Sequence, residues 1–221
     1  MPIMKKHLTR FLFVCSLVLA VSAAQAQRGV FIQNPSSDNF GNNTLTVQLY
    51  PMLFHGYGLE YSRNLYQQKH YLKVNGVCYV SGNWQTHRQT DVRKMLGGEA
   101  GVYHQYNYFE LPKVGFRTYF QWGFNYTYLD MENVAAAKTH IEKLGLNVVV
   151  GFRQNIVKPL FFDFYIGYGQ RWLLDKTIDN TKVSPQVENK AALEPLYNKN
   201  MFDYGHGGAM LVVGLNVGFL F

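Results

Sequence analysis

The stretch from Val114 to Tyr128 alternates between two kinds of side chain at every residue. One parity is mostly apolar and aromatic and consists of Val114, Phe116, Thr118, Phe120, Trp122, Phe124, Tyr126 and Tyr128. The other parity is small and polar and consists of Gly115, Arg117, Tyr119, Gln121, Gly123, Asn125 and Thr127. Successive side chains of a β-strand point to opposite faces, which is the pattern seen here. The stretch therefore predicts a strand with one apolar face and one polar face.

The end of the chain repeats this pattern. One parity of the final run is wholly apolar and consists of Leu211, Val213, Leu215, Val217, Phe219 and Phe221. The composition agrees, because 16 Tyr, 16 Phe and 20 Gly form a mixture rich in strand-forming and turn-forming residues. Similar runs predict eight strands, at residues 44–50, 57–65, 70–81, 95–109, 114–129, 140–155, 161–173 and 209–221. We therefore predict an all-β fold.

The connections between these strands alternate in length. Those at 66–69, 110–113 and 156–160 are short, whereas those at 82–94, 130–139 and 174–208 are longer, with 51–56 as a short exception. Tight turns at one end and longer loops at the other are typical of transmembrane barrels with an even number of strands. The prediction is an eight-stranded antiparallel transmembrane β-barrel over residues 44–221, closed by pairing of the last strand with the first.

The first 26 residues have the features of an export signal. Lys5, Lys6 and Arg10 precede an apolar run at residues 11–24, and Ala24-Gln25-Ala26 places small residues at a cleavage site. We expect residues 1–26 to be a cleaved signal peptide and residues 27–43 to be an extended leader. Removing the three bases lowers the formal net charge from +7 to +4, which is too weak to indicate a nucleic-acid partner.

The volume of the barrel decides which face points outward. The interior of an eight-stranded barrel is only just wide enough for side chains to fill it, so successive aromatic rings do not fit inside. The predicted lipid-facing residues are Phe116, Phe120, Trp122, Phe124, Phe162 and Phe164. Tyrosines near the strand ends, at positions 106, 108, 126 and 128, are expected at the membrane interface. A soluble lipocalin-like binding barrel, which is apolar inside and polar outside, is an alternative.

The opposite parity places charged side chains inside the barrel. The predicted lumen network consists of Glu60, Lys73, Glu99, Arg117, Arg153, Asp163 and Arg171. Three acids and four bases in a narrow tube are expected to pair into a closed plug, because unpaired charges there would be costly. Counting residues across 156–160 puts Arg153 opposite Asp163, and the same counting across 66–69 makes Glu60 and Lys73 diagonal neighbours.

The final strand carries a resemblance to a known family. Leu215, Val217, Phe219 and Phe221 resemble the C-terminal strand of small outer-membrane β-barrels of the OmpA/OmpX type, and residues 56–61 and 162–169 are similar to strands of uncharacterised Bacteroidota barrels. The resemblance implies location in the bacterial outer membrane. It also implies that outer-membrane lipid and the barrel assembly machinery are partners, with the last strand as assembly signal. Such barrels include adhesins, anchors, protease resistance factors and lipid-modifying enzymes, so the fold does not decide the function.

Catalysis and metal binding find little support in the sequence. An outer-membrane lipid A-modifying enzyme, an acyl hydrolase or transferase, would need a serine near a histidine, and neither Ser62 nor Ser81 has a histidine at a spacing that forces contact. The histidines in or beside the outer loops, at positions 55, 87, 140 and 206, form no metal-binding spacing. We expect no catalytic residue, metal or cofactor, and the lipid A enzyme is kept as the alternative.

The connection at 174–208 is the longest and is rich in polar residues. Loops of this kind are the usual place for recognition. Two interpretations stay open: a solvated loop without a partner, and a surface for adhesion or recognition of an extracellular ligand. The favoured function is therefore a non-enzymatic outer-membrane barrel with a closed polar lumen and a structural or surface-interaction role.

Overall fold

The computed structural model describes residues 43–49, 56–67, 69–82, 92–133, 138–179, 181 and 207–221. Within these ranges the chain forms eight strands and one short 3-10 turn, η2 (Pro112–Val114). The strands are β1 (Asn43–Gln48), β2 (Gly56–Tyr66), β3 (His70–Gly82), β4 (Val92–Leu111), β5 (Phe116–Asn133), β6 (Lys138–Val157), β7 (Leu160–Asp179) and β8 (Gly208–Leu220). Among the described residues, no helix is long and apolar enough to cross a membrane.

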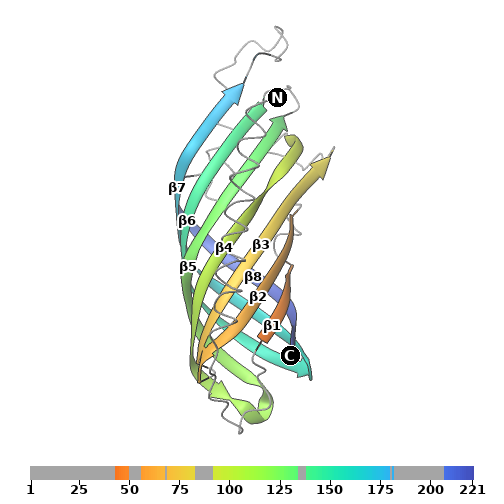
Figure 1. The fold of residues 1–221 in the computed structure, drawn as a ribbon, viewed down its shortest axis with the longest axis vertical. Helices are drawn as coiled ribbons and strands as arrows, with labels where there is room; N and C mark the ends of the chain where they lie inside the picture. The colour runs from red at the N-terminus through yellow and green to blue at the C-terminus, as the bar shows by residue number, and fades with distance from the viewer. Residues whose placement is uncertain are drawn as a thin grey trace.

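The eight strands form one closed antiparallel barrel, as predicted (Figure 1). The last strand closes the ring on the first, because Leu45 pairs with Phe219 and Val47 with Val217. Following paired residues once around the ring from Arg117 leads back to β5 at Thr127, ten residues further along that strand. Such a stagger accompanies the strand tilt of roughly 35–45° that is typical of closed barrels.

The two ends of the barrel differ. The turns after β2, β4 and β6 lie with the C-terminus at one end, which we call the short-turn end; the opposite end is the loop end. Figure 1 shows β5, β6 and β7 rising beyond β1 and β2 at the loop end. The contrast follows from strand length, since β6 and β7 have 20 residues each and β1 has 6.

Several predicted strand boundaries are wrong. β7 continues to Asp179 where a loop was predicted from residue 174, and pairing of Glu132 with Lys138 shortens the connection predicted at 130–139. Polar residues at the ends of these strands still form backbone hydrogen bonds with the neighbouring strand, so the sheet extends past the apolar part of the sequence. At the other end, β5 begins at Phe116, two residues later than predicted, because η2 precedes it and Gly115 ends that turn with a φ of 66°.

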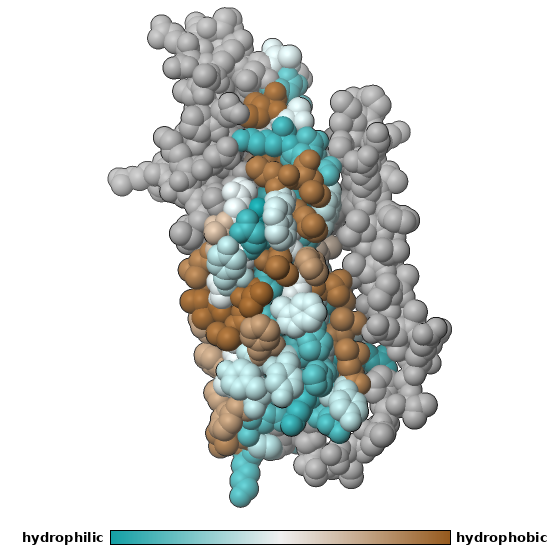
Figure 2. All heavy atoms as spheres, turned by 90° about the vertical axis from the view of Figure 1, so that its left-hand side faces the viewer, coloured by the Kyte–Doolittle hydropathy of each residue, from teal (hydrophilic) through white to brown (hydrophobic). Residues whose placement is uncertain are grey.

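The two faces of the sheet differ in the direction that the alternation predicts. Trp122 and Phe124 point outward and are 45% and 52% exposed, while Arg117 and Arg153 point inward and are fully buried. Figure 2 shows apolar side chains on the outer surface, mainly over the upper and middle part of this side, with less apolar residues among and below them. Among the described residues this is the reverse of the polar exterior that a lipocalin-like barrel requires.

Glycines make room inside the barrel for large side chains. A Cβ atom at Gly214 would collide with the ring of Tyr165, and one at Gly218 would collide with the ring of Phe161. Inward rings and inward glycines therefore occupy neighbouring positions on β7 and β8. The glycines thus leave room for these rings inside the barrel.

The inner wall is not polar throughout. Near the loop end, Met95, Leu129, Met131 and Ile141 are each at most 3% exposed and pack together, with Tyr79 against them. Met95 pairs with Met131 and Leu129 pairs with Ile141 on adjacent strands. We call these four residues the apolar cluster. The sequence analysis did not anticipate it, because it expected polar contacts along the whole lumen.

Candidate functional site

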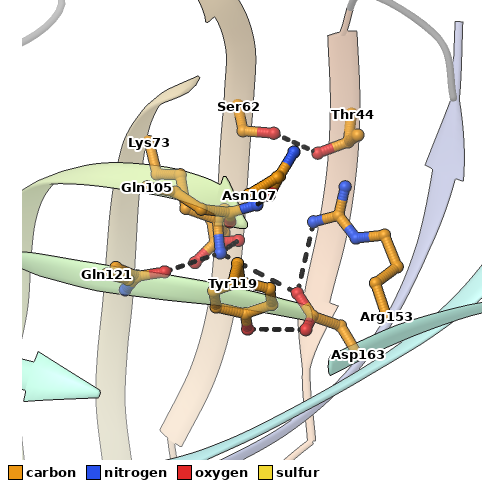
Figure 3. Close-up of polar contacts among 10 residues, drawn as sticks. Thr44, Ser62, Lys73, Gln105, Asn107, Tyr119, Gln121, Arg153 and Asp163 are labelled. Atoms are coloured by element: carbon orange, nitrogen blue, oxygen red, sulfur yellow. Dashed lines mark hydrogen bonds and ion pairs between the residues drawn. The ribbon is translucent and has the colours of Figure 1, made fainter. Parts of the chain in front are cut away.

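A buried ion-pair network crosses the lumen, and Lys73 on β3 lies at its centre (Figure 3). Its Nζ lies 2.9 Å from Glu60 Oε1 and 3.8 Å from Asp163 Oδ2, and it donates a hydrogen bond of 2.9 Å to Gln121 Oε1. The side chains of Lys73, Glu60 and Asp163 are at most 1% exposed. The ammonium group therefore has one hydrogen-bond acceptor and two carboxylates within ion-pair distance.

Asp163 on β7 extends the network across the barrel. It accepts a hydrogen bond of 2.6 Å from Tyr119 Oη and one of 3.2 Å from Arg153 Nη2. Arg153 lies directly opposite Asp163, which is the pairing that residue counting across 156–160 predicts. β3 and β7 are four strands apart in a ring of eight, so the contact between Lys73 and Asp163 joins opposite walls. The network thus spans the lumen from one wall to the other at this level.

Arg117 lies beside the network, directly opposite Arg153 on the neighbouring strand. Its Nε lies 3.6 Å from Glu110 Oε1, and its guanidinium lies 5.3 Å from the centre of the Tyr71 ring. Arg153 is stacked over Phe161 instead, at 4.0 Å from the ring centre. Separate aromatic and acidic neighbours compensate the repulsion that two like charges at facing positions would otherwise cause.

Glu99 and Arg171 belong to a second group, closer to the loop end. Arg171 Nη1 donates a hydrogen bond of 2.6 Å to Asn147 Oδ1, and Asn147 Nδ2 donates one of 3.4 Å to Tyr103 Oη. Thr127 Oγ1 donates a hydrogen bond of 3.1 Å to Glu99 Oε2. The seven predicted lumen residues therefore all point inward, but they fall into two levels.

Lys143 and Glu110 are charged residues of the described lumen that were missed. Lys143 is on the inward parity of β6 and is only 8% exposed, so the alternation could have found it. Glu110 was assigned to a turn, but the register of β4 against β5 shifts between Asn107 and Phe109. This irregularity turns Glu110 to face Arg117. No parity count shows a bulge in advance.

The residues predicted to face lipid lie on the outer surface of β5 and β7. Three of them are well exposed, with Phe120 at 37% besides Trp122 and Phe124. Phe116, Phe162 and Phe164 are half-buried because all three pack around the ring of Phe152, at centroid distances of 5.6 to 6.4 Å. Phe152 and these three rings form an aromatic cluster on the outer face of the barrel.

The final strand also turns its apolar parity outward. Phe219 is 51% exposed and Phe221 is 64% exposed, while Leu215 and Val217 are half-buried. Phe221 exchanges two backbone hydrogen bonds with Asn43, so the last residue is fixed to the first strand. The inward parity of this strand includes Asn216, which is fully buried.

Ser62 is hydrogen-bonded to a threonine and not to a histidine, and the side chain of Ser81 lies outside the described part. Ser62 is 1% exposed and its hydroxyl is hydrogen-bonded to Thr44 Oγ1. His104 lies on the outer face, 3.2 Å from the ring nitrogen of His70 and against Trp122. The described part of the chain holds no group of three or more His, Cys, Asp or Glu side chains placed to bind a metal ion. Three of the four outer-loop histidines (His55, His87 and His206) lie outside the described residues.

His140, the fourth of these histidines, lies between two carboxylates near the loop end. Its Nδ1 is 2.8 Å from Asp130 Oδ1 and its Nε2 is 3.3 Å from Glu142 Oε1. The hydrogen bond with Asp130, and then the charges of both acids, raise the pKa of His140 above its ordinary value. Tyr128 packs edge-on against His140 and donates to Asp130, so it is buried instead of lying exposed at an interface as predicted.

Comparisons with known proteins give a fold likeness and no family. No family model matches the chain, and no curated protein matches it. A crystal structure of Neisserial surface protein A is similar, with a TM-score of 0.47 and 7% sequence identity over 81% of this chain and 93% of that one. The assignment of an eight-stranded barrel rests on the strand register of this chain itself.

Proposed function

We propose that the chain is an integral outer-membrane β-barrel without catalytic activity, whose lumen is closed by the buried ion-pair network. The observation that carries the proposal is the inversion of its two faces. Charged side chains such as Arg153 and Lys73 are fully buried, whereas Trp122, Phe124 and Phe219 are about half exposed. An exterior with many exposed large apolar side chains is a liability in water and is favoured in lipid.

Exposed aromatic residues near both ends of the outer face support a membrane-spanning band between them. Tyr106 and Tyr108 lie near the short-turn end of β4, and Trp172 lies toward the loop end of β7. These three side chains are 38%, 57% and 44% exposed. Tyr and Trp favour the two membrane interfaces, where one part of the ring is dry and the polar atom is wet. The outward residues between them on β5 are aromatic or small, and the first outward carboxylate beyond is Asp130.

The closed lumen supports a structural role over conduction. Lys73 and Asp163 meet across the barrel axis, and Glu60, Gln121, Tyr119 and Arg153 surround them. An ion would have to displace several charge-assisted hydrogen bonds to pass this level. Eight strands also leave no aqueous bore once side chains fill the interior.

The proposal also assigns one segment to interaction at the cell surface and one strand to assembly of the barrel in the membrane. We assign surface interaction to the connection predicted at 174–208, of which residues 180 and 182–206 lie outside the described part. We assign the assembly signal to Leu215, Val217, Phe219 and Phe221, whose outward placement supports reading by the barrel assembly machinery. Export by the signal peptide at residues 1–26 would deliver the chain to that machinery.

Quenching by brominated lipids tests the membrane placement. The full mature chain is reconstituted with Trp122 or with Trp172 as the single remaining tryptophan, the other two being replaced by Phe. We expect Trp122 to be quenched most by bromine deep in the acyl chains and Trp172 most by bromine near the headgroups. Absence of quenching at both positions would contradict the proposal and favour a soluble barrel.

Mass spectrometry of lipid A tests the absence of catalysis. Cells with and without the protein are compared, and we expect the same number of acyl chains in both. A change in acyl number that depends on the protein would replace this proposal with the lipid-modifying enzyme.

A further inference from the structure

Each of the three short turns carries one exposed lysine. Lys69 lies between β2 and β3, Lys113 lies between β4 and β5, and Lys158 lies between β6 and β7. The turn residues 66–70, 111–115 and 157–160 contain no acid. By contrast, the described loop end carries both signs, with Asp130, Glu132 and Lys138 close together on β5 and β6. The three short turns themselves thus carry only positive charge, and Glu110, which directly precedes the second turn, is paired with Arg117.

The closed ring fixes the spacing of these lysines. Two strands separate one short turn from the next in a ring of eight, so successive turns are about a quarter of the circumference apart. The fourth quarter holds the junction of β8 and β1, where Phe221 and Asn43 are hydrogen-bonded. The lysines therefore surround the barrel instead of gathering on one side. A compact ligand would meet one of them, whereas an extended anionic surface around the barrel would meet all three.

Exposed apolar residues accompany each lysine. Tyr66 precedes Lys69 and is 56% exposed, and Val114 follows Lys113 and is 60% exposed. Ile156 and Val157 precede Lys158 and are 58% and 63% exposed. Apolar groups beside an amine suit an interface where the apolar part enters the acyl region and the amine stays among headgroups. A purely aqueous partner, such as a wall polymer, gives these apolar residues nothing to bury against.

We propose that the three short turns bind the anionic phospholipid headgroups of the leaflet that faces the periplasm. The inference rests on the proposed function, since it needs the barrel to lie in a membrane with its short turns at the periplasmic side. Lysines near an anionic surface each contribute roughly a fivefold preference, from about 1 kcal/mol per residue. The attraction weakens as salt screens it.

The test measures which lipids surround the reconstituted barrel. The full mature chain is placed in phosphatidylcholine bilayers, and spin-labelled phosphatidylglycerol and phosphatidylcholine are compared for association with the protein. Lys69→Gln/Lys113→Gln/Lys158→Gln is the test variant. Lys94→Gln/Lys138→Gln, which removes two exposed lysines at the loop end, is the matched control. Lys138 faces Glu132 and Asp179 in the register, so its charge is already balanced.

We expect the wild type to prefer phosphatidylglycerol several-fold, and added salt to reduce that preference. The triple variant should lose most of the preference and the control should keep it. The inference is overturned if the wild type inserts but shows no preference, or if the triple variant keeps its preference. It is also overturned if only binding to purified peptidoglycan is lost in the triple variant, because the partner is then the wall polymer. Failure of the wild type to insert into phosphatidylcholine at all would instead overturn the proposed function.

Discussion

The lumen is filled in two different ways along its length. In the half near the short turns, Lys73 and Arg153 are held by Glu60 and Asp163 at full burial. Near the loop end, the same inward parity carries Met95, Leu129, Met131 and Ile141, which exclude water without any charge. The difference shows that inward positions in this barrel require side chains that fill the interior, and that these side chains can be charged or apolar. The two regions should also respond differently to mutation, because leaving a buried charge without its partner lowers the free energy of unfolding more than removing one methyl group from an apolar side chain.

The largest expected effect is at the centre of the ion-pair network. Lys73→Met should strand the carboxylates of Glu60 and Asp163 and lower the free energy of unfolding by about 3–5 kcal/mol. Urea titration of the folded barrel in detergent measures it. Lys73→Met/Glu60→Gln should recover part of the loss, because the double variant leaves one fewer buried charge. A single variant as stable as the wild type would show that the lumen charges are not shielded from water.

The apolar cluster should respond to truncation by a slightly smaller amount. Ile141 is fully buried, so Ile141→Ala should lower the free energy of unfolding by about 2–4 kcal/mol through lost burial and the cavity left behind. The same urea titration applies, with Ile166→Ala on the exposed outer face as the control in detergent. Equal effects of Ile141→Ala and of the control would contradict the assignment of the cluster to a packed interior.

Removal of Arg153 should have an intermediate effect. Asp163 would keep the hydrogen bond from Tyr119 and the nearby Lys73, so Arg153→Ala should cost about 2–3 kcal/mol, below the value for a fully stranded partner. Coupling is measured by a double-mutant cycle with Asp163→Ala. The double variant should lose less stability than the sum of the two single losses, because the two side chains share one contact. Strictly additive losses would mean that the two side chains do not interact.

The sequence predicts those features of the fold and of the lumen network that depend on one strand or one tight turn, and not those that depend on several strands. The parity of β5 gave the direction of Arg117 and Trp122, and counting across a tight turn gave the pairing of Arg153 with Asp163, because period and register are local properties. The inward position of Glu110 depends on a bulge, and the contact of Lys73 with Asp163 depends on how the ring closes. Neither the bulge nor the closure of the ring can be predicted from the residues of one strand. The apolar cluster was missed because the inward parity of β5 changes from polar or small to apolar at Leu129 and Met131, at and beyond the end of the strand predicted at 114–129.

The smallest expected effect concerns the loop end outside the membrane band. Both ring nitrogens of His140 face carboxylates, and the hydrogen bond to Asp130 is the main cause of its raised pKa. Stability from this contact is fully present below the ordinary pKa of about 6.5 and is lost as pH rises through the higher pKa of the folded state. Because the site is partly exposed, the loss should be roughly 0.5–1 kcal/mol.

Amide hydrogen exchange near the loop ends of β5 and β6 measures this change between pH 5.5 and 8.5, after correction for intrinsic rates. His140→Asn should remove the pH dependence there and leave exchange at the level of Lys73 unchanged. If protection rises with pH in the wild type, the direction assigned to His140 is wrong.

Ion flux through reconstituted barrels tests the closed lumen most directly. Vesicles are loaded with salt, and insertion of the wild-type chain is verified by its heat-modifiable migration on gels. The contact of Lys73 with Asp163 across the barrel and the packed apolar cluster together predict no release above that of protein-free vesicles. Steady release that increases with the amount of inserted wild-type protein would contradict the account, because it requires an open path through both levels of the lumen.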